Sequence, residues 1–188
     1  MRDGAPTKAK IARTALGLFV KQGVTETTIK DIARAAGVAE GALYRHYPSK
    51  EALAWDLFST SFAAFARELD DLQRQRATTR AKLEAMIRQF CAFFDRDRTL
   101  FTYLLLAQHG QLARVTPEMP NPTEVLRSVI ARGMARKEIS KGDPDVATAM
   151  VMGLVLQVAV GRLYGRVTRD LSSLADSLVA AAWRVLKG

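Results

Sequence analysis

The sequence predicts an all-α protein in which a small N-terminal helical domain is joined by one long helix to a larger C-terminal helical domain. Apolar residues recur at helical spacing through most of the chain. Residues that favour helix N-termini precede these segments, and the punctuation typical of strands and hairpins is scarce. With 188 residues, the chain can bury a substantial core. We expect two domains, residues 1–50 and 51–188.

The segment 27–53 has the pattern of two short helices around a tight turn, followed by the start of a longer helix. Thr28 is expected to cap the first short helix, and Asp31 three residues later completes a capping box. Gly37 lies where the chain reverses, because glycine adopts the left-handed backbone conformation without steric cost. This is the helix-turn-helix pattern, whose second helix enters the major groove of DNA. The inward apolar positions are Ile29, Ile32, Ala33, Ala36, Val38, Ala42 and Leu43.

Two runs within this segment carry a family resemblance. Residues 43–53 read LYRHYPSKEAL, and residues 27–33 read TTIKDIA and are followed by Gly37 and Val38. Both runs resemble the DNA-binding domain of TetR-type transcriptional regulators (TetR/AcrR-like), over roughly the first 55 residues. The resemblance implies a helix-turn-helix regulator, most often a repressor, whose C-terminal helical domain binds an effector and dimerises.

Charge supports a nucleic-acid partner. The formal net charge is +9, and residues 1–50 hold nine Lys or Arg residues against four Asp or Glu residues. This concentration of positive charge suits phosphate binding.

In TetR-like proteins, the positions that match Thr28, Tyr44 and Lys50 contact phosphates, and early positions of the second helix read bases. Tyr47 suits core packing as well as phosphate contact, and His46 also suits the helix junction. Arg2 is a further candidate contact from the N-terminus. The predicted DNA-binding residues are Thr27, Thr28, Lys30, Ala39, Glu40, Gly41, Ala42, Tyr44, Arg45, His46, Tyr47 and Lys50.

The recognition helix departs from the family at Ala39, where Ser or Thr usually supplies the N-cap. Loss of such a cap costs about 1 kcal/mol. Glu40 can accept a hydrogen bond from a cytosine amino group, and Ala42 can contact a thymine methyl. With few strong base-reading groups, readout is expected to depend also on DNA shape.

The remaining helices follow in order from capping signals and apolar spacing. The first precedes the helix-turn-helix pair, and a long helix begins at the N-cap Ser49. No Pro- or Gly-rich linker interrupts this long helix, so a stiff connection is expected. Asn121-Pro122 and Asp143-Pro144 each announce a helix, because proline suits the first helical position. The predicted ranges are about 7–23, 49–75, 78–95, 99–110, 122–137, 144–164 and 171–186.

The helix at 144–164 is apolar on every side between residues 149 and 161, which predicts burial on all sides. A partner subunit is the expected cover, and the resemblance implies a four-helix bundle formed with the last helix. An intramolecular core is the alternative. The predicted dimer interface consists of Met150, Gly153, Leu154, Gln157, Gly161, Leu174, Leu178 and Ala182.

Bulky apolar residues of the central helices are candidates for an effector pocket, although each suits a core position as well. A neutral or anionic apolar ligand is favoured, with Arg88, His109 and Arg132 as candidate partners for an anionic group. The candidate pocket residues are Met86, Phe90, Phe93, Phe94, Phe101, Tyr103, Leu104, Met119 and Met134.

Catalysis and cofactors are not predicted. The chain has no metal-binding His/Cys cluster, glycine-rich phosphate loop or nucleophile elbow, so no metal, cofactor or enzymatic activity is expected. Cys91 is the only cysteine and is expected to be a buried, inert thiol. No signal-peptide pattern is present, and the apolar run 149–161 is short for a membrane span, so a cytoplasmic protein is expected.

Two alternative functions stay open. The first is a DNA-binding regulator controlled by a protein partner, and the second is an enzyme or carrier with an incidental helix-turn-helix.

Overall fold

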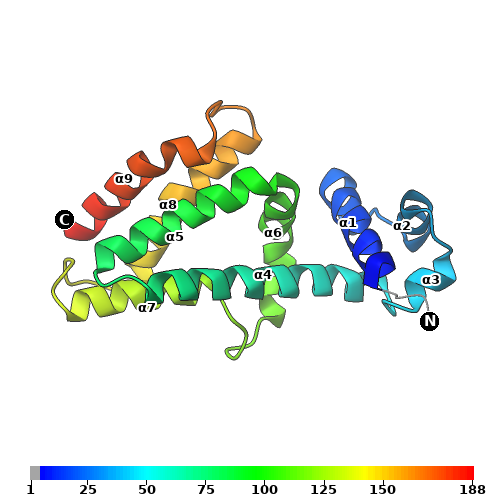
Figure 1. Ribbon diagram of the computed structural model, residues 1–188, viewed down its shortest axis with the longest axis horizontal. Coiled ribbons are helices and arrows are strands. Elements are labelled where there is room, and N and C mark those ends of the chain that lie inside the picture. The colour runs from blue at the N-terminus through cyan, green and yellow to red at the C-terminus, as the bar shows by residue number, and fades with distance from the viewer. Residues whose placement is uncertain (1–4) are drawn as a thin grey trace. The chain divides into compact units, whose positions relative to one another are not determined.

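The computed structural model describes residues 5–188, apart from the side chains of Gln108 and His109. The described residues form helices joined by turns and loops, which confirms the predicted all-α class (Figure 1). Arg2 and the His109 side chain, two of the predicted contacts, lie outside the described residues. The helices are α1 (Ala5–Gln22), α2 (Ile29–Ala36), α3 (Glu40–Tyr44), α4 (Lys50–Arg74), α5 (Thr79–Arg96), α6 (Arg98–Gln111), α7 (Pro122–Ala135), α8 (Pro144–Leu163) and α9 (Ala175–Lys187), with 3-10 turns η1 (Leu112–Arg114) and η2 (Leu171–Leu174).

The chain forms two compact units. The N-terminal unit contains the residues up to Ser61 together with Thr99–Thr116, and the C-terminal unit contains Phe62–Arg98 together with Pro117–Gly188. Helix α4 contributes residues to both units. This division differs from the predicted one after residue 50, because α6 belongs with the first helices.

The place of α6 follows from one buried tyrosine. The Tyr103 ring stacks on Phe19 of α1 with 5.9 Å between the ring centroids, and its hydroxyl donates a hydrogen bond to the Ala54 carbonyl at 2.6 Å. Tyr103 is 2% exposed, and burial raises its pKa above the usual value. The apolar residues buried with it in α1 to α4 of this unit are Ile11, Ala15, Leu16, Phe19, Ile32, Ala33, Ala36, Leu43, Leu53, Ala54 and Phe58, whereas Ile29, Val38 and Ala42, predicted to face inward, are only partly buried.

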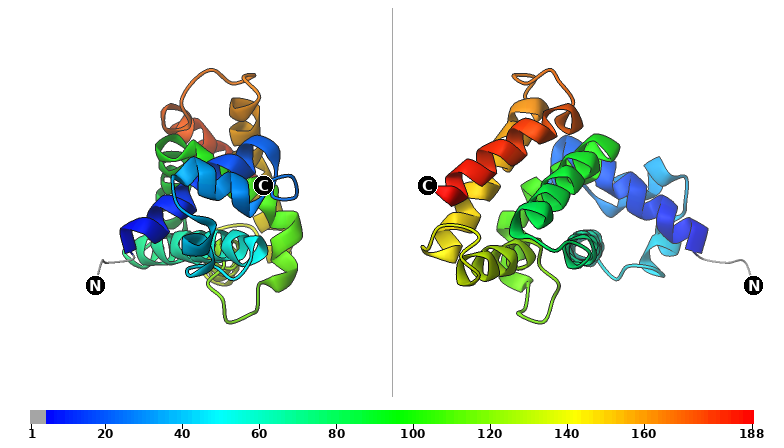
Figure 2. Two further views of the ribbon diagram at one scale, coloured as in Figure 1. Left: turned by 90° about the vertical axis from the view of Figure 1, so that its right-hand side faces the viewer. Right: turned by 60° about the vertical axis from the view of Figure 1, so that its left-hand side comes forward.

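In the C-terminal unit, α5 and α8 each pack against both α7 and α9. Helices α8 and α9 lie side by side in both views of Figure 2. Gly133 marks a close approach between α7 and α5, because a Cβ at this position would lie 2.7 Å from the Thr79 side chain. The packing of this unit therefore depends on a small residue at this point of α7.

Two carboxylates cap helices that lie far away in sequence. Glu138 accepts a hydrogen bond from the Thr79 backbone N–H at 2.6 Å, at the N-terminus of α5, and this bond lowers the Glu138 pKa. Asp95 accepts from the backbone N–H groups of Leu171 and Ser172 at 3.1 and 2.8 Å. Burial raises the Asp95 pKa, but the bonds from Ser172 and Leu171 outweigh it and lower the pKa overall. Both carboxylates satisfy N–H groups that a helix start leaves without partners.

Helix α8 was expected to be buried on all sides, and within this chain it is buried on one. Val151, Val155 and Ala159 are at most 5% exposed, whereas Val146 and Met150 are 50% and 53% exposed. By length and composition α8 would suffice to cross a membrane. Its buried side instead packs against α7 and α9 within the C-terminal unit, so its apolar character has a structural role in this fold.

Candidate DNA interface and apolar cavity

The start of α2 is fixed by the predicted capping box. The Asp31 backbone N–H donates to the Thr28 hydroxyl at 3.1 Å, and the Thr28 backbone N–H donates to the Asp31 carboxylate at 3.1 Å. Bonds from the Thr28 hydroxyl and backbone lower the Asp31 pKa. The box sets where α2 begins and leaves the side chain of Thr28 exposed at that terminus.

The turn and the recognition helix also follow the predicted pattern. Gly37 is left-handed, with φ 60° and ψ 41°, and the Val38 backbone N–H donates to the Ala33 carbonyl at 3.0 Å. Helix α3 then begins at Glu40, and the preceding Ala39 has the extended backbone of an N-cap (φ −70°, ψ 146°) but its side chain makes no capping hydrogen bond. The side-chain N-cap that the sequence predicted to be missing from α3 is therefore absent in the structure as well.

Most of the predicted DNA-binding side chains are accessible. Tyr44 is 52% exposed at the end of α3, and Lys50 donates from Nζ to the Thr25 carbonyl at 2.9 Å. An ammonium group has three donors, so this bond leaves Lys50 with donors for a phosphate. Exposed positions are Thr28, Lys30, Ala39, Glu40, Gly41, Tyr44 and Arg45, and partly exposed ones are Ala42, His46 and Lys50.

Two predicted DNA contacts are instead buried. Tyr47 is 3% exposed and donates a hydrogen bond from its hydroxyl to Asp56 at 3.1 Å, while Lys8 lies 3.6 Å from the same carboxylate. Burial and the Asp56 charge raise the Tyr47 pKa. Thr27 is 0% exposed, and its hydroxyl donates to the Gly23 carbonyl at 2.7 Å. Both residues therefore support the N-terminal unit from inside, and the set of candidate DNA contacts is corrected to exclude them.

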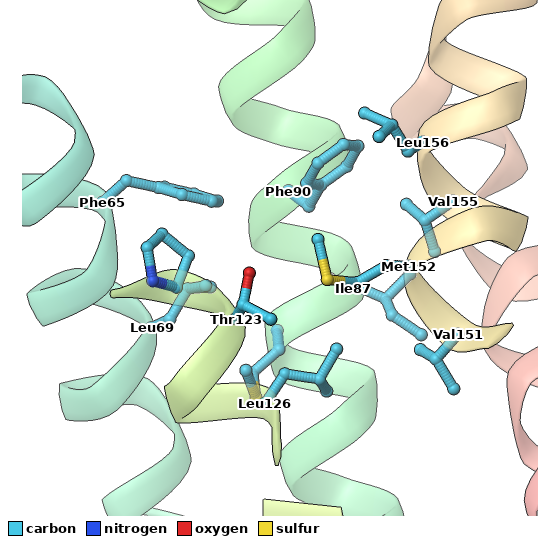
Figure 3. Close-up of a pocket in the computed structure, with 12 residues that line it drawn as sticks. Phe65, Leu69, Ile87, Phe90, Thr123, Leu126, Val151, Met152, Val155 and Leu156 are labelled. Carbon is cyan, nitrogen blue, oxygen red and sulfur yellow. The ribbon is translucent and has the colours of Figure 1, made fainter. Parts of the chain in front are cut away.

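The C-terminal unit contains a cavity of about 110 Å3 between α4, α5, α7 and α8. Figure 3 shows Phe65 and Leu69 on one side and Val151, Val155 and Leu156 on the other. The wall is almost entirely hydrocarbon, so the cavity suits an apolar chain or ring. The lining residues are Phe65, Leu69, Met86, Ile87, Phe90, Pro122, Thr123, Leu126, Val151, Met152, Val155 and Leu156.

The aromatic end of this cavity is ordered by ring contacts. Phe65 of α4 stacks on Phe93 with 4.8 Å between the centroids and an interplanar angle of 27°. Phe65 and Phe90 are tilted by 58° at 6.4 Å. These rings connect α4 to α5 beside the cavity.

Of the predicted pocket residues, Met86 and Phe90 line this cavity. Phe93 and Phe94 are buried core residues that do not line it, and Phe101, Tyr103 and Leu104 belong to the N-terminal unit, because α6 packs there. Met119 lies in the loop before α7, and Met134 lines a second cavity. Arg88 is paired with Glu84 and Asp176, and Arg132 donates to the Ser128 carbonyl; neither lines the cavity.

Sequence reasoning missed the walls supplied by α4, α7 and α8. Helical periodicity indicates that apolar residues of these helices face inward. It contained no signal that the inward space is incompletely filled, since a cavity depends on side chains from four helices at once.

The predicted dimer residues lie on two different faces. Met150, Gly153 and Gln157 are exposed on α8, and Leu154, Gly161 and Leu174 are partly exposed. Leu178 and Ala182 are 7% and 0% exposed, on the side of α9 that packs within the unit. The apolar spacing of α9 identified its core stripe, so these two residues are corrected to core positions.

Among the described residues, no group of three or more His, Cys, Asp or Glu side chains is placed to hold a metal ion. Cys91 is 0% exposed, and burial, with the Asp95 charge, raises its pKa to about 11. A thiol with so high a pKa is a poor nucleophile.

Comparisons with known proteins agree with this architecture. Residues 11–56 match the profile of the bacterial regulatory proteins of the tetR family. A Mycobacterium tuberculosis protein described as a mycofactocin biosynthesis transcriptional regulator, MftR, is 34% identical over 188 residues, covering 96% of this chain and 89% of its own length. The fatty acid metabolism regulator protein of Bacillus subtilis is 23% identical over 184 residues, covering 95% of each chain.

A solved structure has the same fold. The transcriptional regulator FadR from Bacillus subtilis, in complex with stearoyl-CoA, matches with a TM-score of 0.74 at 19% identity, over 93% of this chain and 97% of that one.

Proposed function

Since this chain belongs to the tetR family of bacterial regulatory proteins and is a DNA-binding transcriptional regulator, we propose that it represses transcription as a homodimer and is released from its operator by an effector with an apolar chain. The observation that carries the effector proposal is the hydrocarbon cavity in the C-terminal unit. The cytoplasm is the proposed compartment, because the operator is chromosomal DNA.

The DNA-binding part of the proposal rests on the exposed side chains of α2, α3 and the start of α4. Thr28, Tyr44 and Lys50 offer donors to phosphates, and the front of α3 offers Glu40 and Ala42 to base edges. In a homodimer, two such helices would occupy major-groove half-sites of a palindrome about 34–36 Å apart.

The effector is proposed to be a fatty acyl thioester or a related molecule with a long hydrocarbon chain. Two observations support this class: the wall of the cavity is apolar, and FadR, a protein of the same fold, binds stearoyl-CoA. The cavity of about 110 Å3 is small for a long chain. Met86 and Met152 in its wall are unbranched and adaptable, so they can change rotamer to admit more of the chain.

Helix α4 is the proposed link between effector and DNA. It begins at Lys50, a candidate phosphate contact, and one side of it supplies Phe65 and Leu69 to the cavity wall. A ligand that displaces Phe65 acts on the same continuous helix that carries Lys50. The two binding events are then reciprocally coupled, by about 1–3 kcal/mol, which is 5- to 150-fold in affinity.

The proposal is tested in two steps. The pure protein is titrated against DNA from upstream of its own gene at two salt concentrations, with random DNA as the control. Binding to one palindrome about 10³-fold more tightly than to random DNA supports the regulator; equally weak, steeply salt-dependent binding to both contradicts it for that site.

The second step measures the melting temperature with stearoyl-CoA and with coenzyme A alone. A rise with stearoyl-CoA only supports an apolar-chain effector. No rise with acyl thioesters of any chain length favours a regulator controlled by a protein partner, the alternative without a small-molecule effector.

A further inference from the structure

Arg162, near the end of α8, has a buried donor without a partner. Its Nε is shielded from solvent and has no hydrogen-bond partner among the described residues, although the side chain as a whole is 20% exposed. One terminal nitrogen, Nη2, donates to the Asp170 carboxylate at 3.3 Å. A buried N–H without an acceptor lowers stability, because the hydrogen bond that it made to water is not replaced. The Nε–H of Arg162 is therefore available to an acceptor that reaches it from inside the C-terminal unit.

The helix places Arg162 on the side of α8 that faces the apolar cavity. Val151 and Val155 line the cavity, and Arg162 follows them by eleven and seven residues, spacings that return to the same side of a helix. The helical rise puts Arg162 about 10 Å beyond Val155 along α8. Long helical side chains lean back toward the N-terminus of their helix, and for Arg162 this is the direction of the cavity.

Helix α5 ends near the same place. Figure 3 shows Phe90 of α5 and Leu156 of α8 at one end of the cavity. Beyond Phe90, Asp95 accepts a hydrogen bond from the Leu171 backbone N–H at 3.1 Å. Asp170, which directly precedes Leu171, is the carboxylate that accepts from the arginine. The guanidinium therefore lies beyond the aromatic end of the cavity, where α5, α8 and η2 meet.

We propose that Arg162 binds the acyl head of the effector, with its Nε–H donating to the acyl oxygen while the hydrocarbon chain occupies the apolar cavity. This inference rests on the proposed apolar-chain effector and adds the group that orients it. An acyl oxygen is the acceptor shared by a fatty acid carboxylate and a fatty acyl thioester. A guanidinium suits both, because a hydrogen bond from a charged donor is stronger than one between neutral groups.

Asp170 distinguishes the two kinds of acyl head. It is 70% exposed and shares the guanidinium through Nη2, so it offsets the charge of Arg162 before a ligand binds. Its carboxylate also repels a ligand carboxylate that approaches the same guanidinium. A thioester carries no charge at its carbonyl, so Asp170 should oppose a free acid more than a thioester.

The test compares two substitutions of Arg162 with a control. Arg162→Met removes the guanidinium and keeps a long apolar side chain, whereas Arg162→Lys keeps the charge but has no N–H at the position of Nε. Arg166→Met is the matched control, because Arg166 is exposed just beyond the end of α8. Calorimetric titration measures the affinity for laurate, lauroyl-CoA and dodecyltrimethylammonium below their micelle concentrations. The last probe has a chain of the same length and no acceptor.

Arg162→Met should weaken the binding of laurate, lauroyl-CoA or both about ten- to hundredfold, the effect of one hydrogen bond from a charged donor. Arg162→Lys should lose most of the same affinity, and Arg166→Met should bind as the native chain does. A loss for laurate alone identifies a free carboxylate as the head, and a loss for both identifies the oxygen that they share. Dodecyltrimethylammonium should bind Arg162→Met no more weakly than it binds the native chain, because Arg162 offers it no acceptor and repels its charge.

Two further measurements separate ligand binding from a structural role. Arg162→Met removes a buried donor that lacks an acceptor in the ligand-free chain, and the pair with the exposed Asp170 contributes little, so the melting temperature should not fall. Asp170→Asn should strengthen laurate binding more than lauroyl-CoA binding. A lowered melting temperature with native affinity for both acyl ligands would show that Arg162 has a structural role and would overturn the proposal.

Failure of this inference can be told apart from failure of the proposed function. If Arg162→Met binds laurate and lauroyl-CoA as the native chain does, the role of Arg162 is overturned while the apolar-chain effector stands. If the native chain binds neither of these ligands nor stearoyl-CoA, both proposals are overturned.

Discussion

The Tyr103 hydroxyl donates a hydrogen bond to the carbonyl oxygen of Ala54 at 2.6 Å, joining α6 to α4 inside the N-terminal unit. The same ring stacks on Phe19 of α1. A residue proposed from sequence as part of an effector pocket thus ties together three helices of the DNA-binding part of the chain. It stabilises the platform that carries α2 and α3.

Tyr103→Phe should therefore lower the free energy of unfolding and leave effector binding unchanged. The lost hydrogen bond is buried, so the expected cost is about 0.5–1.5 kcal/mol. Urea denaturation measures the stability, and a stearoyl-CoA titration measures binding. A variant with native stability and impaired effector binding would contradict this prediction and show that Tyr103 contributes to the effector site.

Tyr44 and Tyr47 form a matched pair for the DNA interface. Tyr44 is 52% exposed and Tyr47 is 3% exposed with its hydroxyl bonded to Asp56. Tyr44→Phe should weaken operator binding and random-DNA binding alike, with the melting temperature unchanged. Tyr47→Phe should lower stability by about 1 kcal/mol and leave the operator affinity of the folded protein unchanged. The reverse pattern would mean that Tyr47 reaches DNA.

Lys50→Ala should weaken binding to all DNA sequences and reduce the slope of log affinity against log salt by about one unit. The physical reason is the loss of one phosphate contact. Because Lys50 also donates to the Thr25 carbonyl, the free energy of unfolding of the Lys50→Ala variant must be measured in parallel. Lys21→Ala, an exposed lysine at the end of α1, is the control. An unchanged salt slope for Lys50→Ala would show that Lys50 makes no contact with a DNA phosphate.

Ala39→Ser supplies the side-chain cap that α3 lacks. The Ala39 backbone is already extended, as an N-cap requires. The substitution should stabilise α3 by about 1 kcal/mol, visible as slower hydrogen exchange of its amides. Ala35→Ser, on the exposed side of α2, is the control and should not have this effect. If exchange in α3 is unaltered by Ala39→Ser, the helix start is ordered by packing alone.

The Thr28–Asp31 capping box predicts a pH dependence. Hydrogen bonds lower the Asp31 pKa below its ordinary value of 3.8, so the ionised carboxylate stabilises the folded state. This contribution is present above the unfolded-state pKa and is lost as pH falls through the folded-state value. The stability difference between the native chain and Asp31→Asn should be constant above about pH 5 and shrink below pH 4. Urea unfolding between pH 3 and 7 measures it, and a difference that grows on acidification would contradict the sign.

Local patterns in the sequence were sufficient for the helices and their ends. The capping box at Thr28, the left-handed Gly37 and the uncapped Ala39 all depend on residues within a few positions of one another, and each is present in the structure. The all-α class follows from the same local information.

Tertiary packing decided what the sequence left open. Periodicity identified Leu178 and Ala182 as an apolar stripe of α9, but it carried no information on whether that stripe faces its own protomer or a partner. The buried positions of Thr27 and Tyr47 depend on α1 and α4, and the membership of Tyr103 in the N-terminal unit depends on Phe19 and Ala54. Such contacts between distant segments are invisible to spacing rules.

The central claim is that occupation of the apolar cavity weakens operator binding through α4. The direct measurement is operator affinity with and without stearoyl-CoA, for the native chain and for Met152→Trp, which fills the cavity from α8. Met119→Trp, in the loop before α7 and outside the cavity, is the matched control.

The native chain and Met119→Trp should lose operator affinity 5- to 150-fold with the ligand, the range of about 1–3 kcal/mol. Met152→Trp should bind stearoyl-CoA poorly and keep an operator affinity that the ligand does not change. Tight binding of stearoyl-CoA to the native chain with no change in operator affinity would contradict the claim.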